Sequence, residues 1–331
     1  MHAIAKDLPL LNAWQRDFPL CTHPFAVLGC ALDRPVDDIL ATCRHLLHTG
    51  TLSRIGGVFA PGAGGAGMLA AMAVPTERLD EVAAFVSGHP GVNHNYERDN
   101  PLNLWFVITA ADPTAMERLL AGIERHTGLT VERLPMVRPY RIDLGFDLGR
   151  STAAAGGITL AARTPVPEAE AGLAALAEHG LPVMAQPFEA WAQQLGWTES
   201  EVLSVLARWL AQGTLSRFGM VVRHHEMGFT ANAMIVFDVP DEQVDACGEI
   251  LALQPGITLA YRRARTKNWS YNLYCMVHGR ERGEVLALVE QAAQEANIGH
   301  LPHQVLFSLR RFTQRGPRRF AEAMPTKARH A

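Results

Sequence analysis

Arginine, histidine and tyrosine residues form three short clusters in this chain, and their side chains suit the binding of carboxylates and the transfer of a proton. The clusters are Arg223-His224-His225, Tyr261-Arg262-Arg263 and His94-Asn95-Tyr96-Glu97-Arg98. Arginine makes permanently charged, bidentate pairs with carboxylates. Histidine donates or accepts a proton near neutral pH. These clusters could therefore hold a carboxylate and supply a proton.

The spacing within the clusters selects which side chains act together, since successive residues of a strand point to opposite faces. Tyr261 and Arg263 share one face, so one carboxylate could meet both. His94, Tyr96 and Arg98 also share a face and combine a proton donor with carboxylate ligands. Of His224 and His225 only one can face a given pocket, which argues against a two-histidine metal chelate. Between these two, His224 is the preferred candidate.

Further candidates surround these clusters. Lys267, Trp269 and Tyr271 flank a probable hairpin turn, and Arg310 and Arg311 are adjacent on the last predicted strand. Because neighbours on a strand face opposite ways, only one of the two arginines is expected to be a carboxylate ligand. The alternative is that the hairpin is a solvated tip and that the paired histidines are ordinary surface residues.

The elements that position these residues occur twice. Gly50-Thr51-Leu52-Ser53-Arg54 returns as Gly213-Thr214-Leu215-Ser216-Arg217, and Pro90-Gly91-Val92 with Tyr96-Glu97-Arg98 returns as Pro255-Gly256-Ile257 with Tyr261-Arg262-Arg263. Matched motifs in matched order indicate two copies of one folding unit.

Each copy begins with helical periodicity. Thr198 and Glu201 form a capping-box pattern for one helix, which ends at Gly213, and in the first copy Asp33 before Pro35 is expected to open a helix that closes at Gly50. Two helices, a turn and extended chain are typical of a winged helix-turn-helix.

The second part of each copy alternates strand and helix in the order β-α-β-β-α-β, which predicts a ferredoxin-like domain. The expected segments are 68–74, 77–87, 92–98, 104–110, 113–127 and 131–137 in the first copy, and 231–239, 241–253, 257–263, 271–277, 282–295 and 304–312 in the second. The fold class is therefore α+β, a tandem repeat of winged helix-turn-helix plus ferredoxin-like domain.

The domain boundaries follow from this repeat and from a linker rich in Ala, Gly, Thr and Pro. We expect a winged helix in 1–60, a ferredoxin-like domain in 61–148, the linker in 149–168, a winged helix in 169–222, a ferredoxin-like domain in 223–320 and a tail in 321–331.

Composition excludes several classes of protein. The chain has 331 residues, of which 48% are hydrophobic and 19% charged, as in soluble globular proteins. Its apolar stretches are too short to span a bilayer, so no membrane association is expected. The five cysteines form no CxxC pair, which favours reduced thiols and a cytoplasmic location over a disulfide frame or zinc site.

DNA binding is not expected either. The formal net charge is -3, and the candidate recognition helices begin with Asp37 and Asp38 in the first copy and with Glu199 and Glu201 in the second. Acidic residues stabilise a helix N-terminus, but they repel the phosphates that supply most of the affinity for DNA.

The motifs resemble the siroheme decarboxylase family. The resemblance rests on Gly91-Val92-Asn93-His94-Asn95-Tyr96-Glu97-Arg98 with Asn103-Leu104-Trp105-Phe106, on Arg217 to His225, and on Tyr261-Arg262-Arg263 with the run from Trp269 to Arg280. It covers nearly the whole chain. The layout is also that of the leucine-responsive and asparagine regulators, so the ferredoxin-like domains are expected to be of the AsnC type.

This resemblance implies removal of carbon dioxide from two acetate arms of siroheme, at C12 and C18, to give 12,18-didecarboxysiroheme for d-type haem synthesis. The lyase would need no cofactor and no protein-bound metal, because the iron arrives with the substrate. Arg223, His224, His225 and His94 are the expected catalytic residues. The expected substrate ligands are Tyr96, Arg98, Tyr261, Arg263, Lys267, Trp269, Tyr271, Arg310 and Arg311.

The resemblance also implies that the chain is a fusion of two subunits that pair within the molecule. A further homodimer or additional family subunits remain open. The alternatives are a ligand-responsive regulator of the same layout and a tetrapyrrole carrier without turnover.

The two copies differ where chemistry is expected. Leu259 stands in place of His94, and Pro61-Gly62-Ala63-Gly64-Gly65 stands in place of Arg223-His224-His225. Either the copies combine around one site, or one of two sites is degenerate. We expect a principal pocket in the second copy, with residues of the first contributing to it.

Overall fold

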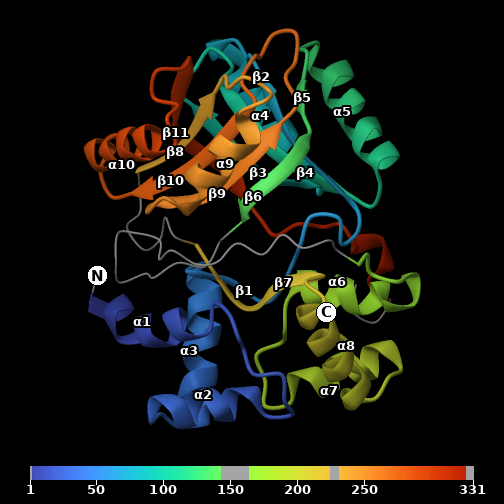
Figure 1. Cartoon of the computed structure of the whole chain (residues 1–331). Coiled ribbons are helices and arrows are strands. Elements are labelled where there is room, and N and C mark those ends of the chain that lie inside the picture. Colours follow the sequence, from blue (N-terminus) through green and yellow to red (C-terminus); the bar gives the residue numbers. More distant parts are fainter. Residues whose placement is uncertain (1, 143–163, 224–230, 326–331) are drawn as a thin grey trace. The chain divides into compact units, whose positions relative to one another are not determined.

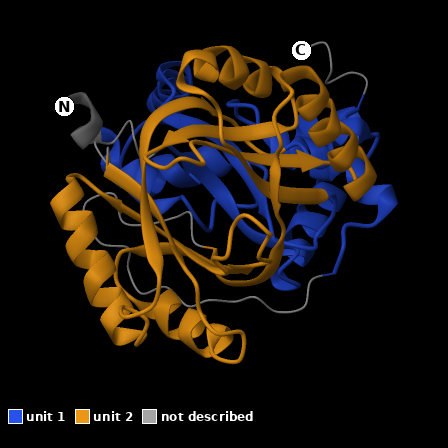
Figure 2. Cartoon of the chain, turned by 90° about the horizontal axis from the view of Figure 1, so that it is seen from above, with its two compact units in different colours: residues 1–65, 161–227, 318–331 blue, residues 66–160, 228–317 orange. Residues whose placement is uncertain are grey.

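A computed structural model describes residues 2–142, 164–223 and 231–325. The chain divides into two compact units, and each unit takes segments from both sequence repeats (Figure 2). Unit 1 comprises Met1–Gly65, Ala161–Met227 and Arg318–Ala331, and unit 2 comprises Ala66–Leu160 and Gly228–Pro317. Most of the expected linker, and both His224 and His225, lie outside the described residues.

Unit 1 holds the helical parts of both repeats (Figure 1). Its elements are α1 (His2–Ala13), α2 (Pro24–Leu32), α3 (Val36–Thr49) and β1 (Leu52–Phe59), then α6 (Ala171–His179), α7 (Pro187–Leu195), α8 (Glu199–Ala211) and β7 (Leu215–Val222), with short 3₁₀ turns at Glu168–Glu170 and Ala321–Ala323. The capping box at Thr198 and Glu201 is confirmed. The strands β1 and β7 pair antiparallel, with Gly56 opposite Gly219. The extended segments of the two repeats therefore pair with each other.

The start of α3 differs from the sequence expectation. Asp33 has a φ of 52° in the left-handed region and ends α2, while α3 begins at Val36 after Pro35. The side chain that pairs with α3 from outside is instead Arg34, which donates to Asp38. Aspartate tolerates the left-handed conformation, so it serves here as a helix stop and not as an N-cap.

Unit 2 holds both β-α-β-β-α-β segments, as predicted. The first comprises β2 (Ala66–Met72), α4 (Leu79–Gly88, after a 3₁₀ turn at Thr76–Arg78), β3 (Val92–Arg98), β4 (Leu104–Ala110), α5 (Pro113–Thr127), β5 (Glu132–Leu134) and β6 (Met136–Ile142). The second comprises β8 (Ala231–Phe237), α9 (Val244–Leu253), β9 (Ile257–Arg263), β10 (Leu273–Gly279), α10 (Arg282–Glu295) and β11 (His303–Gln314).

These strands form one sheet in the order β5-β2-β4-β3-β11-β8-β10-β9-β6. The strand expected over 131–137 is interrupted at Pro135, which has no N–H for the ladder. It then continues as β6, which pairs with β9 of the other repeat. Because β5 and β6 are consecutive, the two edges of the sheet are joined by the chain itself, and the sheet closes on itself (Figure 2).

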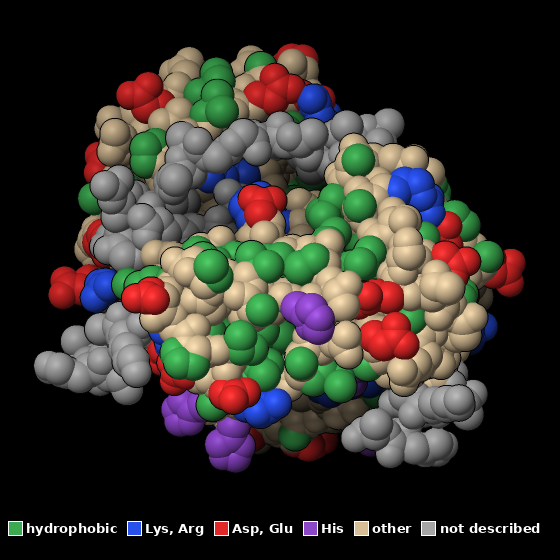
Figure 3. All heavy atoms as spheres, turned by 90° about the horizontal axis from the view of Figure 1, so that it is seen from below, with side chains coloured by type: hydrophobic (Ala, Val, Ile, Leu, Met, Phe, Trp, Pro, Cys, Tyr) green, Lys and Arg blue, Asp and Glu red, His purple; other side chains and the backbone are tan. Residues whose placement is uncertain are grey.

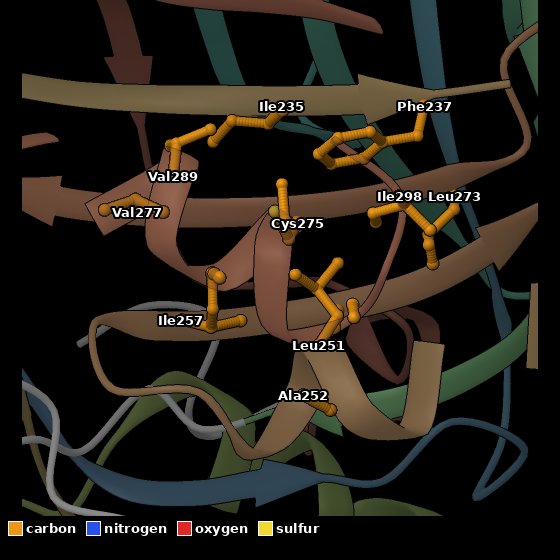
Figure 4. Packing of buried hydrophobic residues seen from close by; sticks show 14 of the residues in the cluster. Ile235, Phe237, Leu251, Ala252, Ile257, Leu273, Cys275, Val277, Val289 and Ile298 are labelled. Carbon is orange, nitrogen blue, oxygen red and sulfur yellow. The ribbon is translucent and has the colours of Figure 1, made fainter. Parts of the chain in front are cut away.

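The closed sheet has a helix-covered outer face and an inner face. On the outer face, Phe237, Leu251 and Val289 belong to a cluster between the second repeat's strands and its helices α9 and α10 (Figure 4). A matching cluster lies under α4 and α5. On the inner face, Leu69 and Trp105 of the first repeat pack with residues of the second. The inner face is therefore built jointly by the two repeats.

Candidate active site on the inner face of the closed sheet

Two junctions join the repeats, and they have the same register. At the β3–β11 junction, Arg98 pairs with Ser308, Tyr96 with Arg311 and His94 with Gln314. At the β9–β6 junction, the corresponding pairs are Arg263 with Met136, Tyr261 with Pro139 and Leu259 with Ile142. Both junctions carry register irregularities at the same two places. The repeat in the sequence is therefore a two-fold relationship in the sheet.

A buried arginine occupies the same position at each junction. The Nη1 atom of Arg98 donates to the Leu306 carbonyl at 2.8 Å, and that of Arg263 donates to the Leu134 carbonyl at 2.6 Å. Each residue is only 6% exposed. Among the described residues neither guanidinium has a carboxylate partner, and neither Nε atom has a hydrogen-bond partner. Buried charges are normally paired, so these positions suit an anion supplied from outside the chain.

The Arg98 guanidinium stays protonated despite its burial. Burial lowers the pKa of the Arg98 guanidinium to about 10, and the same cause lowers the pKa of Arg263. A pKa near 10 still leaves the group charged at neutral pH. Arg98 therefore remains a cation within an enclosed environment, where its attraction for a carboxylate is stronger than in water.

A tyrosine precedes each arginine by two residues and lies beneath its guanidinium. The guanidinium carbon of Arg98 is 5.7 Å from the Tyr96 ring centre, and that of Arg263 is 5.0 Å from the Tyr261 ring centre. Burial raises the pKa of Tyr96, and it raises the pKa of Tyr261 to about 12. Both hydroxyl groups therefore stay protonated at neutral pH and are available as hydrogen-bond donors to a carboxylate.

The structure separates the two candidate arginines on β11. Arg311 is opposite Tyr96, affects the pKa of that tyrosine, and donates from Nη1 to Gln314 Oε1 at 3.1 Å. Arg310 instead pairs with Asp80 at 2.8 Å and with Glu97 on the helix-bearing face. Of the two, Arg311 therefore lies on the inner face beside Tyr96, and Arg310 lies on the outer, helix-bearing face.

His94 lies beside Tyr96 on β3. The two ring centres are 6.2 Å apart in an edge-to-face arrangement, and the His94 ring is half-buried. β3 therefore presents a histidine, a tyrosine and an arginine at alternate positions, as the spacing predicted.

The residues of the expected hairpin have a different environment. Trp269 is 7% exposed, belongs to the inner apolar cluster and donates from Nε1 to the Tyr274 hydroxyl at 2.8 Å. Tyr271 packs on Trp269 with ring centres 4.9 Å apart, and Lys267 is exposed near the tip. Trp269 and Tyr271 are thus part of the packing that supports the Arg263 strand.

A cavity of about 520 Å³ adjoins this hairpin. Its lining residues are Ala73, Asn100, Pro101, Leu102, Thr130, Glu132, Asn268, Trp269 and Gln304. None of the inner-face arginines, histidines or tyrosines lines it. Trp269 is the one candidate from the sequence that does.

A histidine that the sequence analysis did not select lies on the inner face of β10. Nδ1 of His278 is 3.1 Å from the Thr258 hydroxyl, which donates its only hydrogen to the Met276 carbonyl at 3.1 Å. Nδ1 must then carry a proton, and Nε2 is the acceptor atom. Burial, with a smaller effect of Arg98, lowers the pKa of His278 to about 4. Alternation along β10 puts His278 on the opposite face from the apolar Val277, and this pattern could have identified His278 from the sequence.

Arg223 belongs to unit 1, where its backbone N–H donates to the Thr51 carbonyl and its Nη1 to the Gly50 carbonyl at 3.1 Å. It therefore joins the end of β7 to the first repeat. His224 and His225 follow it outside the described residues, so their geometry stays a prediction.

The helices that would read DNA are acidic or internally engaged. Thr22 donates to Glu199, Arg208 pairs with Glu170 at 2.5 Å, and Arg44 donates to the Val183 carbonyl. On the face in Figure 3, lysine and arginine side chains are scattered among acidic and apolar ones. Arg208 and Arg44 are therefore engaged in contacts within the protein.

Two further features concern metals and membranes. Within the described ranges, no group of three or more His, Cys, Asp or Glu side chains is arranged to hold a metal ion. No helix of that part of the chain is both long and apolar enough to cross a bilayer.

Family models match both parts of each repeat. A siroheme decarboxylase NirDL-like HTH domain matches residues 7–52 and 173–215, and an AsnC-like ligand binding domain matches residues 63–141 and 226–313.

Relatives of this chain match nearly all of it or one half of it. The chain is 42% identical over 313 residues to a siroheme decarboxylase NirDL subunit of Paracoccus pantotrophus, covering 94% of this chain and 96% of that protein. It is 31% identical over 320 residues to a siroheme decarboxylase of Hydrogenobacter thermophilus, covering 95% and 94%. A siroheme decarboxylase NirL subunit of Stutzerimonas stutzeri is 46% identical over 43% of this chain and 85% of its own length. Separate subunits in one organism and fused chains in others imply that the two halves pair within this molecule.

Solved structures give the same result. A crystal structure of the siroheme decarboxylase NirDL superposes with a TM-score of 0.68 and 26% identity, over 98% of this chain and 97% of that one. A second NirDL structure, a co-complex with an iron-uroporphyrin III analogue, matches with the same score and identity over 99% and 97%.

Proposed function

Because this chain belongs to the siroheme decarboxylase family, we propose that it is a lyase that decarboxylates siroheme. The finer proposal is that it removes the carboxyl groups of the acetate arms at C12 and C18. The product is then 12,18-didecarboxysiroheme, which serves d-type haem synthesis. The Paracoccus and Hydrogenobacter relatives carry the name of this activity.

The observation that carries this proposal is the pair of buried arginines on the inner face. Arg98 and Arg263 occupy equivalent positions, and each has a buried Nε atom without a partner in the described part of the chain. Siroheme bears several carboxylates around its ring. Two equivalent cationic positions, each beside a tyrosine hydroxyl, match a substrate with carboxylates on more than one side. The solved relative with an iron-uroporphyrin III analogue supports a tetrapyrrole as the ligand.

The chemistry requires positioning and a proton. When the C–C bond to a carboxylate breaks, carbon dioxide leaves and the electron pair stays on the methylene carbon next to the pyrrole. The macrocycle delocalises that charge as an electron sink. One proton then converts the carbon to a methyl group, so each decarboxylation consumes one proton. Arg98 and Arg263 hold carboxylates that are not lost, and a histidine supplies the proton.

We propose no cofactor for this reaction, because the macrocycle itself accepts the electron pair and the iron is part of the substrate. The candidates for the proton donor are His94 and one of His224 and His225. Tyr96, Tyr261 and Arg311 are the proposed additional ligands of substrate carboxylates. The reaction is proposed to take place in the cytoplasm and without DNA.

The test is anaerobic incubation of the purified chain with siroheme, followed by mass analysis of the extracted tetrapyrrole. Loss of two carbon dioxide units supports the proposal and means that this chain suffices. Loss of one unit refutes the proposed double decarboxylation by this chain alone. Tightly bound but unchanged siroheme would favour a carrier, and absence of binding would refute the tetrapyrrole substrate.

A further inference from the structure

The two junctions share a tyrosine and an arginine but differ at the positions around them. The inner-face residues around the β3–β11 junction, from β3, β11, β8 and β10, are called the β11 side. Those around the β9–β6 junction, from β9, β6, β2 and β4, are called the β6 side. The repeat relates these strands in this order, and the register of the two junctions gives the residue correspondence.

At the end of the β11 side that carries His94, polar residues lie beside the shared tyrosine and arginine, Tyr96 and Arg98. His94 is opposite Gln314, and Arg311 is opposite Tyr96. Arg311 donates to Gln314 Oε1 and is exposed, so its guanidinium remains accessible to a ligand. This side therefore has a histidine and a second cation next to Tyr96: His94 on the same strand and Arg311 on the paired strand.

The corresponding end of the β6 side, which carries Leu259, is apolar. Leu259 replaces His94, Ile142 replaces Gln314 and Pro139 replaces Arg311. None of these side chains donates a proton or binds a carboxylate. Among the described residues of these three positions, the β6 side therefore places neither a histidine nor a second cation beside Tyr261 and Arg263.

The same contrast extends deeper into the sheet. On the β11 side, Ser308 donates to Asn232 Oδ1 at 2.6 Å, and His278 lies on the next strand, β10. By register, the corresponding residues of the β6 side are Met136, Gly67 and Thr109. A row of polar side chains on one side is therefore replaced by a thioether, a glycine and a threonine on the other.

Thr109 also has its hydroxyl engaged. It donates to Asn93 Oδ1 at 2.8 Å, in a buried pair that corresponds to the contact between His278 and Thr258. The second repeat thus has an imidazole where the first has a closed neutral hydrogen bond.

We propose that His94 on the β11 side delivers the proton of both steps, so that both acetate arms are decarboxylated there one after the other. This inference rests on the proposed function. The β6 side keeps Tyr261 and Arg263 as an anchor for carboxylates that do not react. Each step breaks one C–C bond, releases one carbon dioxide and takes one proton from the β11 side.

A single site has a geometric consequence. The C12 and C18 arms leave the macrocycle at different places, and a misplacement of about 1 Å is enough to slow a positioned reaction about 100-fold. The monodecarboxylated tetrapyrrole must therefore turn, or leave and bind again, between the two steps. The equivalence of Arg98 and Arg263 suits this, because the same carboxylate contacts exist in two orientations.

The test uses His94→Leu, which gives the β11 side the residue of the β6 side, and Arg311→Ala at an exposed position that does not threaten folding. Each variant is supplied separately with siroheme and with purified monodecarboxylated siroheme, and both rates are measured anaerobically. A single site predicts that His94→Leu lowers both rates by the same factor, about 100- to 10,000-fold, as expected for loss of a general acid. Arg311→Ala should weaken both rates together by a smaller factor.

The matched control is Leu259→Ala on the β6 side, which should leave both rates within about twofold of the unchanged protein. A variant that loses one rate and keeps the other would overturn the single site, whichever side carries it. Unaltered rates in both His94→Leu and Arg311→Ala would also overturn it. If the unchanged protein converts neither substrate, the proposed function fails, and that result is distinct from either of these.

Discussion

The buried charge of Arg98 is predicted to bind the substrate while it lowers the stability of the fold, and Arg98→Met separates the effect on binding from the effect on stability. Burial lowers the pKa of this guanidinium from 12.5 to about 10. One pKa unit corresponds to about 1.4 kcal/mol, so the charged form is disfavoured by about 3 kcal/mol relative to water. Methionine has a flexible apolar side chain that removes this penalty.

The substitution also removes the hydrogen bond from Nη1 to the Leu306 carbonyl. A buried carbonyl left without a donor costs about 1–3 kcal/mol. The two effects nearly cancel, so the free energy of unfolding of Arg98→Met should lie within about 2 kcal/mol of the unchanged protein. Replacement of a buried charge by an apolar side chain is often neutral in this way.

Siroheme binding should respond very differently. A charge-assisted hydrogen bond contributes about 1.5–3 kcal/mol, so its loss should weaken binding about 10- to 150-fold. Urea denaturation of the apo protein gives the first quantity, and an anaerobic absorbance titration with siroheme gives the second. Arg138→Met is the matched control, because Arg138 pairs with Asp245 and Glu249 on the outer face. Unchanged siroheme affinity in Arg98→Met, with a large loss of stability, would refute the reasoning.

Three further predictions concern stability. Burial lowers the pKa of His278 from 6.5 to about 4, so as pH falls this residue is protonated in the unfolded protein before it is protonated in the folded protein. The free energy of unfolding should therefore decline between pH 6.5 and pH 4. His278→Gln should flatten that decline, measured as the urea midpoint at each pH. Gly248 lies against the Tyr140 ring of β6, so Gly248→Ala should cost about 1–3 kcal/mol in denaturation, whereas Gly283→Ala, where the added methyl has open space, should not. Thr198→Ala removes the capping box of α8 and should cost about 1 kcal/mol, and an equal stability of the two proteins in thermal melts would contradict that assignment.

Local patterns predicted much of this fold. The segments expected at 92–98, 104–110, 113–127, 257–263 and 282–295 are those of β3, β4, α5, β9 and α10. Each of these elements is an apolar or alternating stretch or has helical periodicity, and glycine or proline marks the start of several of them, such as Gly91 before β3, Pro113 in α5 and Gly256 before β9. Such signals lie within the segment or next to it.

The crossover of β6 could not be found in the same way. Val131 to Val137 was expected to be one strand, but Pro135 interrupts it, and residues up to Ile142 pair with β9 of the other repeat. That pairing is non-local, and nothing within 136–142 specifies its partner. The closure of the sheet depends on the pairing of β6 with the free edge of β9, which is more than 100 residues away in the sequence.

The site was predicted in part for a related reason. Alternation placed His94, Tyr96 and Arg98 on one face of β3, as the structure has them. The choice between Arg310 and Arg311 depended on two irregularities in the β11 ladder, which no residue pattern announces. His278 was not selected, although alternation along β10 places it on the same face as Tyr274 and Met276.

The most direct test of the central claim is an anaerobic crystal structure of this chain with siroheme. We predict the macrocycle on the inner face of unit 2, with carboxylates within hydrogen-bond distance of the Arg98 and Arg263 guanidinium groups. Siroheme in the cavity lined by Leu102 and Trp269, or away from both arginines, would contradict the account.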